Sequence, residues 1–410
     1  MIKKIKATNF KSFESLDIEL GKFNVLIGAN ASGKSNFVSI FKFLRDVVTS
    51  GLDNAISMQG GVEYLRNMNI GTSKNLSIKF VSDEEFRLAT PVKGKLIGIK
   101  AYEMIYEFAL RFNKRGYGYR VVKDKLTLKC KVVRLKRKER KIEEKESLGD
   151  GEIIISRSNG QVKIKLFKDL REKDIFPPFL PEEKLPNRML LLETPYFLIP
   201  FPVREIFDGI SIYDFDPKLS KKAYPITGRA ELEENGENLS IVLKNIIQSK
   251  ERRRKLFNLV KELLPFVENL DVEKFADKSL LFKLQEIYFR NQYLPASLIS
   301  DGTINITALI IALYFEKKPL IIIEEPERNI HPYLISKVVD MMKDASQKKQ
   351  IVVTTHNPEI VKHAGLENIL LISRNENGFS IVSRPADKEE VKTFLKNNIG
   401  IEELYIQDLL

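Results

Sequence analysis

Apolar residues near the start of the chain recur in patterns that predict three strands. Residues 2–10 and 15–20 show the spacing of half-buried strands around a short turn. Residues 23–27 are mostly apolar, which is typical of a strand buried on both faces. A glycine-containing loop at residues 28–36 comes next, and residues 37–44 then carry apolar side chains at helical spacing. The pattern therefore predicts a strand, a glycine loop and a helix in that order.

The middle of the chain changes pattern twice. Residues 102–167 alternate and are broken by turns, which predicts an antiparallel β region. Residues 171–230 are proline-rich and irregular, most clearly at residues 176–181. Residues 238–264 return to helical spacing, and Pro265 ends that segment.

The last part of the chain alternates between strands and helices. We expect a helix after Gly302, strands at 319–324, 350–355 and 368–373, and helices at 333–345 and near 387–396. The apolar runs among them predict strands buried on both faces, and such strands place polar residues at their carboxyl ends, where open α/β sheets bind ligands.

Composition narrows the class of protein. The chain has 410 residues, of which 43% are hydrophobic and 30% charged, as in a soluble globular protein with one large core or two ordinary ones. Its net charge of +12 favours contact with polyanions such as nucleic acid. The densest basic run, residues 129–141, is followed at once by the acidic residues 143–146. This run is either a nucleic-acid contact or a solvated hairpin.

Several classes of protein are disfavoured. The longest apolar run, residues 306–315, is about half of what a membrane span needs, and residues 1–13 contain no signal-peptide core. Cys130 is the only cysteine and the chain has three histidines, so we expect neither a disulfide framework nor a zinc cluster. A reducing, cytoplasmic location fits these features.

The glycine loop matches the pattern G-x-x-x-x-G-K-[ST], whose backbone N–H groups surround phosphates at a helix N-terminus. Lys34 would reach the β- and γ-phosphates of ATP, and the Ser35 hydroxyl would bind Mg²⁺. The residues predicted to contact the nucleotide here are Gly28, Ala29, Asn30, Ala31, Ser32, Gly33, Lys34, Ser35 and Asn36.

The apolar strand at 319–324 ends in two adjacent carboxylates, Glu324 and Glu325, before Pro326. A magnesium ion shared by Ser35, the phosphates and Glu324 would neutralise one of them. Glu325 would then orient or deprotonate the attacking water. The alternative is that both glutamates only end the strand and pair with lysines.

Two further segments carry candidate chemistry. His356 ends the strand at 350–355, where it would hydrogen-bond a γ-phosphate or the water, unless its role is structural. Ser300, Asp301, Gly302 and Thr303 open the helix after Gly302 and would form a second anion site, although Ser300 or Asp301 would cap that helix in any case. One triphosphate seldom needs two such sites, whereas two chains that face each other do.

These motifs resemble the ATP-binding-cassette ATPase heads of the SMC, RecF and OLD group, and most closely the stand-alone predicted ATPases with an AbiEii/OLD-like AAA domain. In the resemblance, residues 28–35 are Walker A, 321–325 are Walker B with the catalytic glutamate, 300–303 are the signature, His356 is the switch histidine, and 328–332 lie at the D-loop. The resemblance extends over nearly the whole chain.

The resemblance implies an α/β fold, an ABC-ATPase head with a mixed β-sheet core that carries the P-loop, an antiparallel β subdomain and a helical lobe. We expect an N-terminal ATPase lobe at 1–170, an irregular and helical insertion at 171–295, and a C-terminal ATPase lobe at 296–410. ATP and Mg²⁺ are the implied cofactors, and the implied assembly is an ATP-dependent homodimer.

Some departures limit what the resemblance implies. The signature reads Ser-Asp-Gly-Thr where transporters have Leu-Ser-Gly-Gly-Gln, and Glu324 stands where many relatives have Asp. Gln59 is a candidate for the Q-loop residue. Only 54 residues follow His356 in the chain of 410, so we expect no appended nuclease of the OLD kind.

Two hypotheses of function follow. The first is an ATPase that dimerises around two ATP molecules and serves DNA repair or phage defence, with DNA or RNA as a partner. The second is a nucleotide-controlled scaffold that holds and releases a separate nuclease or toxin, for which the Phe- and Pro-rich residues 171–205 would be a docking surface. A transporter cassette or a small-molecule kinase is disfavoured, because Glu324, Glu325 and His356 suit attack of water on a phosphate.

Overall fold

The structure is a computed structural model, and it falls into two compact units. It describes residues 1–114, 118–138, 141–167, 170–175, 184–194, 203–289, 292–396, 399–407 and 409–410. The first unit comprises Met1–Gly21, Ala31–Ile210 and Ser373–Val382, and the second comprises Lys22–Asn30, Ser211–Ile372 and Ser383–Leu410. The predicted breaker at 176–181 lies outside the described residues, as do 176–183 and 195–202 of the predicted docking surface at 171–205.

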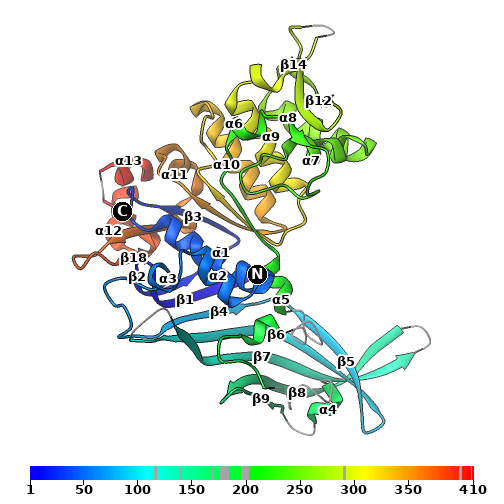
Figure 1. The fold of residues 1–410 in the computed structure, drawn as a ribbon, viewed down its shortest axis with the longest axis vertical. Coiled ribbons are helices and arrows are strands. Elements are labelled where there is room, and N and C mark those ends of the chain that lie inside the picture. Colours follow the sequence, from blue (N-terminus) through cyan, green and yellow to red (C-terminus); the bar gives the residue numbers. More distant parts are fainter. Residues whose placement is uncertain are drawn as a thin grey trace. The chain divides into compact units, whose positions relative to one another are not determined.

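The first unit is built on an eight-stranded antiparallel sheet (Figure 1). Its order is β2-β1-β4-β6-β7-β8-β9, and β5 pairs with β6. The strands are β1 (Ile2–Phe10), β2 (Phe13–Glu19), β4 (Leu76–Ser82), β5 (Phe86–Val92), β6 (Lys95–Phe112), β7 (Tyr119–Lys138), β8 (Lys141–Ser158) and β9 (Gln161–Lys165). The predicted antiparallel region is confirmed, and the sheet also includes the first two strands of the chain.

Helix α1 (Lys34–Ser50) packs on this sheet through aromatic side chains. The Phe43 ring lies 6.1 Å from that of Phe10 on β1 and 6.4 Å from that of Phe108 on β6, measured between centroids. All three side chains are buried, so they fix the helix that follows the glycine loop. The shorter helices of this unit are α2 (Leu52–Met58), α3 (Val62–Leu65), α4 (Glu172–Ile175) and α5 (Val203–Asp208). Gln59 directly follows α2 and is buried.

The basic run lies on β7, and the acidic residues after it lie on the neighbouring strand β8. An Arg134 guanidinium nitrogen is 2.7 Å from a carboxylate oxygen of Glu146, and Lys136 faces Glu143 in register. Lys129 pairs with Glu103 of β6 at 2.6 Å. Cross-strand pairs therefore offset part of the positive charge, as a solvated hairpin requires.

The single cysteine of the chain lies on a central strand of this sheet. Cys130 lies on β7 with no exposed surface. Burial, assisted by the negative charge of Glu152, raises the pKa of its thiol to about 12. The reactive thiolate is therefore almost absent near neutral pH.

A buried carboxyl group in the same sheet makes stability depend on pH. Asp124 accepts hydrogen bonds from the Tyr106 hydroxyl and the Leu191 N–H, both at 2.7 Å, and burial outweighs these contacts and raises its pKa from 3.8 to about 7. Because the folded pKa lies above the unfolded value, this group favours the folded state below about pH 4, and that contribution is lost as the pH rises to about 7. The full shift corresponds to at most about 4 kcal/mol.

We expect the Asp124→Asn protein to lack this pH dependence. Urea unfolding at pH 4.5, 6 and 7.5 measures it, as the difference in free energy of unfolding between wild type and variant. That difference should move in favour of the variant as the pH rises. A difference that stays constant across the three pH values would contradict the expectation.

The second unit contains a sheet whose strands follow the order β10-β15-β16-β3-β17. The strands are β10 (Ile210–Tyr213), β15 (Leu320–Glu324), β16 (Gln350–Thr354), β3 (Phe23–Ile27) and β17 (Ile369–Arg374), whereas β18 (Ser380–Ser383) lies mainly in the first unit. The neighbours β15, β16, β3 and β17 run parallel. Every residue of β3 and β16 is buried, as their apolar runs predict.

Helices surround this sheet. Helix α9 (Asp301–Tyr314) is buried along almost its whole length, and α10 (Pro332–Ser346) and α11 (Pro358–Ala364) follow β15 and β16. The chain continues into α12 (Glu389–Lys396) and α13 (Ile401–Ile406). In the described part of the chain, no helix combines the length and the apolar character needed to cross a bilayer.

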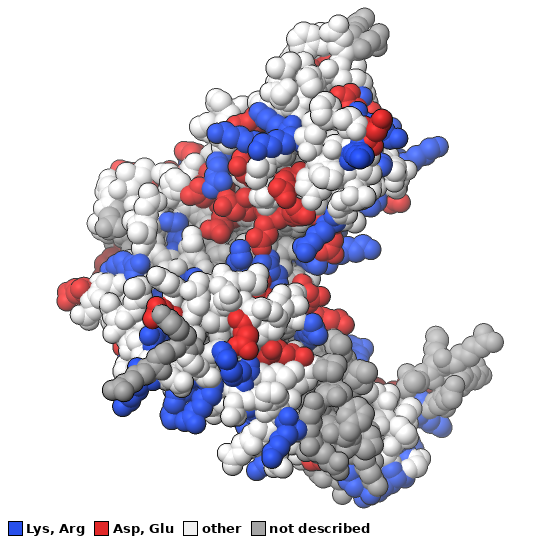
Figure 2. Space-filling model, viewed as in Figure 1, with Lys and Arg blue, Asp and Glu red and all other residues white. Residues whose placement is uncertain are grey.

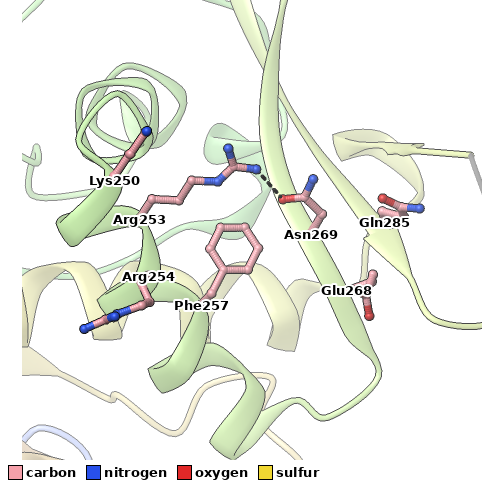
Figure 3. A pocket seen from close by; sticks show the side chains of 7 residues that line it. All are labelled: Lys250, Arg253, Arg254, Phe257, Glu268, Asn269 and Gln285. Carbon is pink, nitrogen blue, oxygen red and sulfur yellow. Dashed lines mark hydrogen bonds between the residues drawn. The ribbon is translucent and has the colours of Figure 1, made fainter.

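The second unit also contains a helical and β-sheet subregion. The helical segment predicted at 238–264 consists of α7 (Leu239–Ile247) and α8 (Lys250–Leu263), because Ser249 caps α8. A small antiparallel sheet of β11 (Tyr224–Pro225), β12 (Val267–Phe275), β13 (Ser279–Glu286) and β14 (Leu294–Pro295) lies beside these helices. Figure 2 shows Lys and Arg side chains at several places on the visible face, among Asp and Glu side chains. A groove separates α8 from β12 and β13 (Figure 3).

Candidate nucleotide site

The carboxyl ends of three adjacent parallel strands lie in register in the second unit. Glu324 of β15 pairs with Thr354 of β16, and Thr354 pairs with Leu26 of β3. The residues that follow these strands therefore lie at one edge of the sheet. They are Glu325, His356 and the first residues of the glycine loop, beginning at Gly28. This is the edge where parallel sheets bind ligands.

Glu325 occupies a tight turn directly after β15. Its φ angle is +45°, in the left-handed region that a non-glycine residue rarely adopts. The turn is held because the Glu325 N–H donates to the Thr354 carbonyl at 2.8 Å and its carbonyl accepts from the Arg328 N–H at 3.0 Å. Backbone strain of this kind is common at functional positions.

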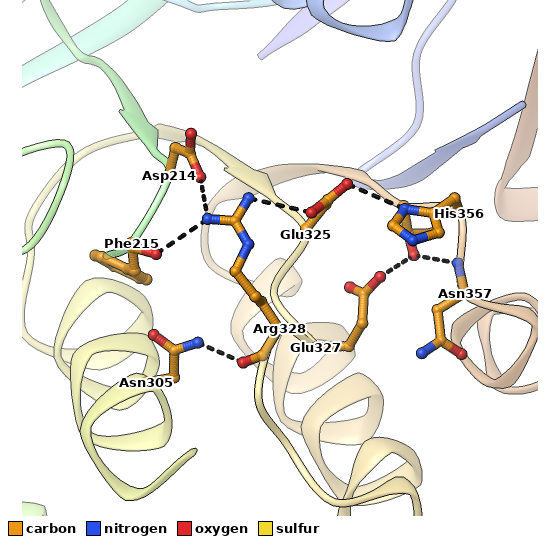
Figure 4. A network of polar contacts seen from close by, with 9 residues as sticks. Asp214, Phe215, Asn305, Glu325, Glu327, Arg328, His356 and Asn357 are labelled. Carbon is orange, nitrogen blue, oxygen red and sulfur yellow. Dashed lines mark hydrogen bonds and ion pairs between the residues drawn. The ribbon is translucent and has the colours of Figure 1, made fainter. Parts of the chain in front are cut away.

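Both carboxylate oxygens of Glu325 contact a basic side chain (Figure 4). Oε1 lies 3.0 Å from His356 Nδ1, and Oε2 accepts from the Arg328 guanidinium at 3.1 Å. Arg328 also donates to the Asp214 carboxylate at 2.8 Å and to the Phe215 carbonyl at 3.3 Å. Glu325 is thus held between a histidine and an arginine that a second carboxylate orients.

The neighbouring carboxylates favour the charged form of Arg328. Partial burial disfavours the charge on Arg328, but its contacts with Glu325 and Asp214 outweigh burial and raise the pKa of the guanidinium. The His356 side chain is 56% exposed, so its ring can contact a ligand as well as Glu325. A carboxylate, an imidazole and a guanidinium in contact can move a proton and stabilise negative charge.

A second glutamate in the same loop has a structural position. Glu327 is buried, and its Oε1 accepts from the Thr355 hydroxyl, which in turn accepts from the Asn357 N–H at 2.9 Å. Its Oε2 is buried and meets no hydrogen-bond partner among the described residues. Burial raises the pKa of Glu327, the hydrogen bond from Thr355 opposes that effect, and the charge of Glu325 adds to it. Glu327 therefore joins the loop after β15 to the loop after β16.

The predicted signature segment lies at the N-terminus of α9. Ser300 caps the helix, because its Oγ accepts from the Thr303 N–H at 3.2 Å, and Asp301 forms an ion pair with Lys221. The alternative role for Ser300, capping of the helix, is therefore observed. The same helix contacts the loop after β15, since the Asn305 amide donates to the Arg328 carbonyl.

Gly302 of α9 lies close to the same loop. A Cβ atom at this position would lie 2.4 Å from the Asn329 carbonyl oxygen, well inside the normal contact distance. We therefore expect Gly302→Ala to displace the loop that holds Arg328, to lower stability by about 1–3 kcal/mol, and to lower ATP turnover at least about tenfold.

Thermal unfolding and phosphate release would measure these two effects. Ala308→Gly, later on the same helix, is the control for a change in stability alone, since it costs about 1 kcal/mol through helix propensity. If Gly302→Ala retained wild-type turnover, the close contact would have no part in positioning the loop.

The remainder of the glycine loop belongs to the first unit, where a serine and an arginine hold it. Gly33 has a φ of +121°, and a Cβ atom there would lie 2.2 Å from the Ser380 hydroxyl. That hydroxyl donates to the Ser32 carbonyl at 2.5 Å and lies 2.8 Å from Ser12 Oγ. Arg374 donates twice to the Ala31 carbonyl, each time at 3.0 Å. The second glycine of the motif is thus required by the close approach of Ser380.

Lys34 and Ser35 form the first turn of α1, so they stand at the positive end of a long helix. Lys34 is half-buried and Ser35 is exposed. Ser35 and Glu324 offer a hydroxyl and a carboxylate oxygen, the hard donors that Mg²⁺ prefers beside phosphates. Across the described residues, no group of three or more His, Cys, Asp or Glu forms a metal cluster.

The second unit brings Glu324, Glu325 and His356 together, with Gly28, Ala29 and Asn30 after the neighbouring strand. Ala31 to Asn36 belong to the first unit. Asp214, Arg374 and Ser380 lie in no motif, so sequence reasoning missed them. Thr355 could have been selected from the polar Thr-Thr-His that ends an apolar strand. The predicted roles of the residues in binding ATP and Mg²⁺ stay predictions.

Comparisons with known proteins identify the family and the fold of the chain. A family model described as "AAA domain, putative AbiEii toxin, Type IV TA system" matches residues 23–362. No curated protein has a matching sequence. A solved chain described as the SmcHead bound to the C-winged helix domain of ScpA matches with a TM-score of 0.50 and 15% identity, over 93% of this chain and 97% of that chain.

Two further solved structures are similar. The Smc head domain with an extended coiled coil from Pyrococcus furiosus has a TM-score of 0.49 and 15% identity, over 97% of this chain and 99% of that chain. The SMC head domain from Thermotoga maritima has a TM-score of 0.43 and 13% identity, over 93% and 98%. At these identities the likeness concerns the fold, and the predicted fold class, an ABC-ATPase head, is confirmed by the match at 0.50.

Proposed function

The chain belongs to this family of AAA domains, and we propose that it binds ATP at residues 28–36 and hydrolyses it with Glu325 as the general base. The observation that carries the proposal is the alignment of Glu324, Glu325 and His356 at the ends of strands adjacent to the one that leads into the phosphate loop. Fold and family membership support nucleotide binding in general, and the named residues support the chemistry.

The loop residues would bind the triphosphate. Backbone N–H groups at the start of α1, together with the Lys34 ammonium group, would surround the β- and γ-phosphates. Ser380 and Arg374 would keep the loop in shape, because they donate hydrogen bonds to the Ser32 and Ala31 carbonyls. Ser35 and Glu324 would hold a magnesium ion, which would supply positive charge to offset the negative charge that develops on the phosphates.

Glu325 would position and deprotonate the attacking water. Its two carboxylate oxygens contact Arg328 and His356, so the attacking water would have to replace one of these two side chains as a partner of Glu325. The exposed His356 ring would then be free to donate to the γ-phosphate, where negative charge develops. Asp214 would position Arg328 throughout.

Dimerisation is the finer part of the proposal. Each ATP would lie between the phosphate loop of one chain and Ser300, Asp301, Gly302 and Thr303 of a second. The N-terminus of α9 supports this, because it offers N–H groups and a partial positive charge at its end. Contact between Gly302 and Asn329 would link that end of α9 to the loop carrying Arg328 within each chain.

Phosphate release by the purified chain with ATP and Mg²⁺ tests the enzymatic proposal, and light scattering with and without ATP tests dimerisation. We expect turnover that EDTA abolishes and a doubling of mass with ATP. Absence of turnover under all conditions would overturn the ATPase. A constant monomer mass would overturn the dimer but leave hydrolysis standing.

A second candidate is a slow, nucleotide-controlled scaffold that holds a separate nuclease or toxin. The engagement of both Glu325 oxygens favours it, because a base already paired with Arg328 and His356 is a poor base until those contacts change. The SMC head solved with a winged-helix domain of ScpA is an example of a head that holds a separate protein. Turnover slower than about 0.01 s⁻¹ and a co-purifying protein would favour the scaffold.

Turnover that duplex DNA stimulates would instead favour a nucleic-acid-linked role such as DNA repair or phage defence. That role rests on the resemblance and on the net charge of +12.

A further inference from the structure

The groove between α8, β12 and β13 combines positive charge with an aromatic side chain. It has a volume of about 540 Å³ and is lined by Lys250, Arg253, Arg254, Phe257, Glu268, Asn269 and Gln285. The basic residues come from one side of α8, and the amides and Glu268 come from the two strands (Figure 3). All of these residues belong to the second unit, and none belongs to the candidate nucleotide site.

Helix α8 carries more positive charge than the carboxylates near it neutralise. Six of its 14 residues are Lys or Arg and two are Glu. Within the described part of the chain, no carboxylate lies at ion-pair distance from Lys250, Arg253 or Arg254, and all three are exposed. Glu268, the one acid that lines the groove, faces Lys261 at 3.6 Å. A helix that leaves three cations unneutralised at a groove is suited to a polyanion.

The aromatic groups determine which polyanion fits. Phe257 points into the groove, and the Arg253 guanidinium lies 5.5 Å from the centre of its ring. Arg253 also donates to the Asn269 amide oxygen at 3.3 Å, and the Asn269 amide nitrogen donates to the Tyr293 hydroxyl at 2.6 Å. Tyr293, which is 36% exposed, therefore stands at the edge of the groove as a second ring.

We propose that this groove binds single-stranded nucleic acid. Lys250, Arg253 and Arg254 would contact successive phosphates, while bases would stack on Phe257 and Tyr293. Cations that follow a backbone, with aromatic faces between them, are the combination by which proteins bind single strands without reading sequence. Asn269 and Gln285 would supply hydrogen bonds to base edges. The inference goes beyond the proposed ATPase and does not depend on it, because binding here needs no nucleotide at residues 28–36.

The test measures fluorescence anisotropy of a labelled dT oligonucleotide of about 15 nucleotides, without ATP. Lys250, Arg253 and Arg254 are all changed to alanine in one variant. We expect binding at least about tenfold weaker in about 100 mM salt, and a salt dependence that is shallower by about 2 in log–log slope. The matched control changes Lys131, Arg134 and Lys136 of the basic run on β7 to alanine, which removes the same charge and should leave affinity within about twofold.

Two further variants separate the contribution of positive charge from that of base stacking. Arg253→Lys with Arg254→Lys keeps the charge and should retain affinity within about threefold. Phe257→Leu keeps the charge and removes the stacking face, so it should weaken oligonucleotide binding about five- to tenfold. It should leave binding of labelled poly-glutamate unchanged. The thermal midpoints of all variants are compared with the wild type, since a loss of binding counts only for a variant that remains folded.

Each outcome decides the proposal. Loss of binding in the groove variant with retention in the β7 control supports it. Equal binding by both variants, or a larger loss in the β7 control, overturns it. Tighter binding of a duplex of the same length overturns a single-stranded ligand. Poly-glutamate that binds through the same three residues as tightly as the oligonucleotide, with no effect of Phe257→Leu on either, would instead assign the groove to an acidic protein.

Discussion

Glu325→Gln is expected to reduce ATP turnover about 100- to 1,000-fold, the typical worth of a positioned general base. The amide has nearly the shape of the carboxylate but cannot accept a proton from water. It also loses the ion pair with Arg328 at 3.1 Å and the contact with His356 at 3.0 Å. Affinity for ATP should change little, because no predicted phosphate contact is removed. With hydrolysis blocked, an ATP-bound dimer should accumulate.

Single-turnover phosphate release, ATP titration and light scattering measure these three quantities on one preparation. Glu327→Gln is the matched control, since it makes the same change two residues further along the same loop. Glu327 is buried against Thr355, and burial raises its pKa and so disfavours its charge, so an uncharged amide should be accepted there. A comparable loss of turnover in both variants would show that the loop, and not a base at Glu325, had been lost. A Glu325→Gln protein that stays monomeric with ATP would contradict the proposed dimer.

Lys34→Ala is expected to weaken ATP binding at least about 100-fold, by removing the ammonium group from the first turn of α1. The half-buried Lys34 stands where the helix end and the loop backbone already favour an anion. A charge there acts in a less polar setting than bulk water, so its loss costs more than that of a surface lysine.

Isothermal titration with ATP and Mg²⁺ measures the effect. Lys42→Ala removes the same charge from the same helix, about 12 Å further along at 1.5 Å per residue, and should change affinity less than about threefold. The prediction fails if both variants lose affinity equally, since the effect would then reflect net charge, or if Lys34→Ala binds ATP within threefold of wild type.

The sequence was most informative where apolar runs end in polar residues. The run that ends in Glu324 and the run before His356 could belong only to buried strands, and parallel pairing in register then forces their ends together. The glycine loop was readable because its backbone conformation needs particular residues at fixed spacing.

Other parts of the site could not be predicted, because they depend on contacts between distant segments. Asp214 lies 114 residues before Arg328, and Ser380 lies 348 residues after Ser32. No local pattern connects such pairs. The β12 strand was missed for a different reason, since only two of its nine residues are buried and charged residues interrupt its alternation.

The position of Cys130 inside the sheet of the first unit has a practical consequence for spectroscopy. Its thiol is buried and its pKa is about 12, so maleimides and nitroxide reagents should leave the native protein unlabelled near pH 7. A cysteine introduced at an exposed position of α8, such as Arg252→Cys, would then be the single reactive thiol in a background that needs no prior mutation. A single dye attached to such a cysteine can then report on ligand binding at the groove, or on changes during the ATP cycle, in a chain that carries no other mutation.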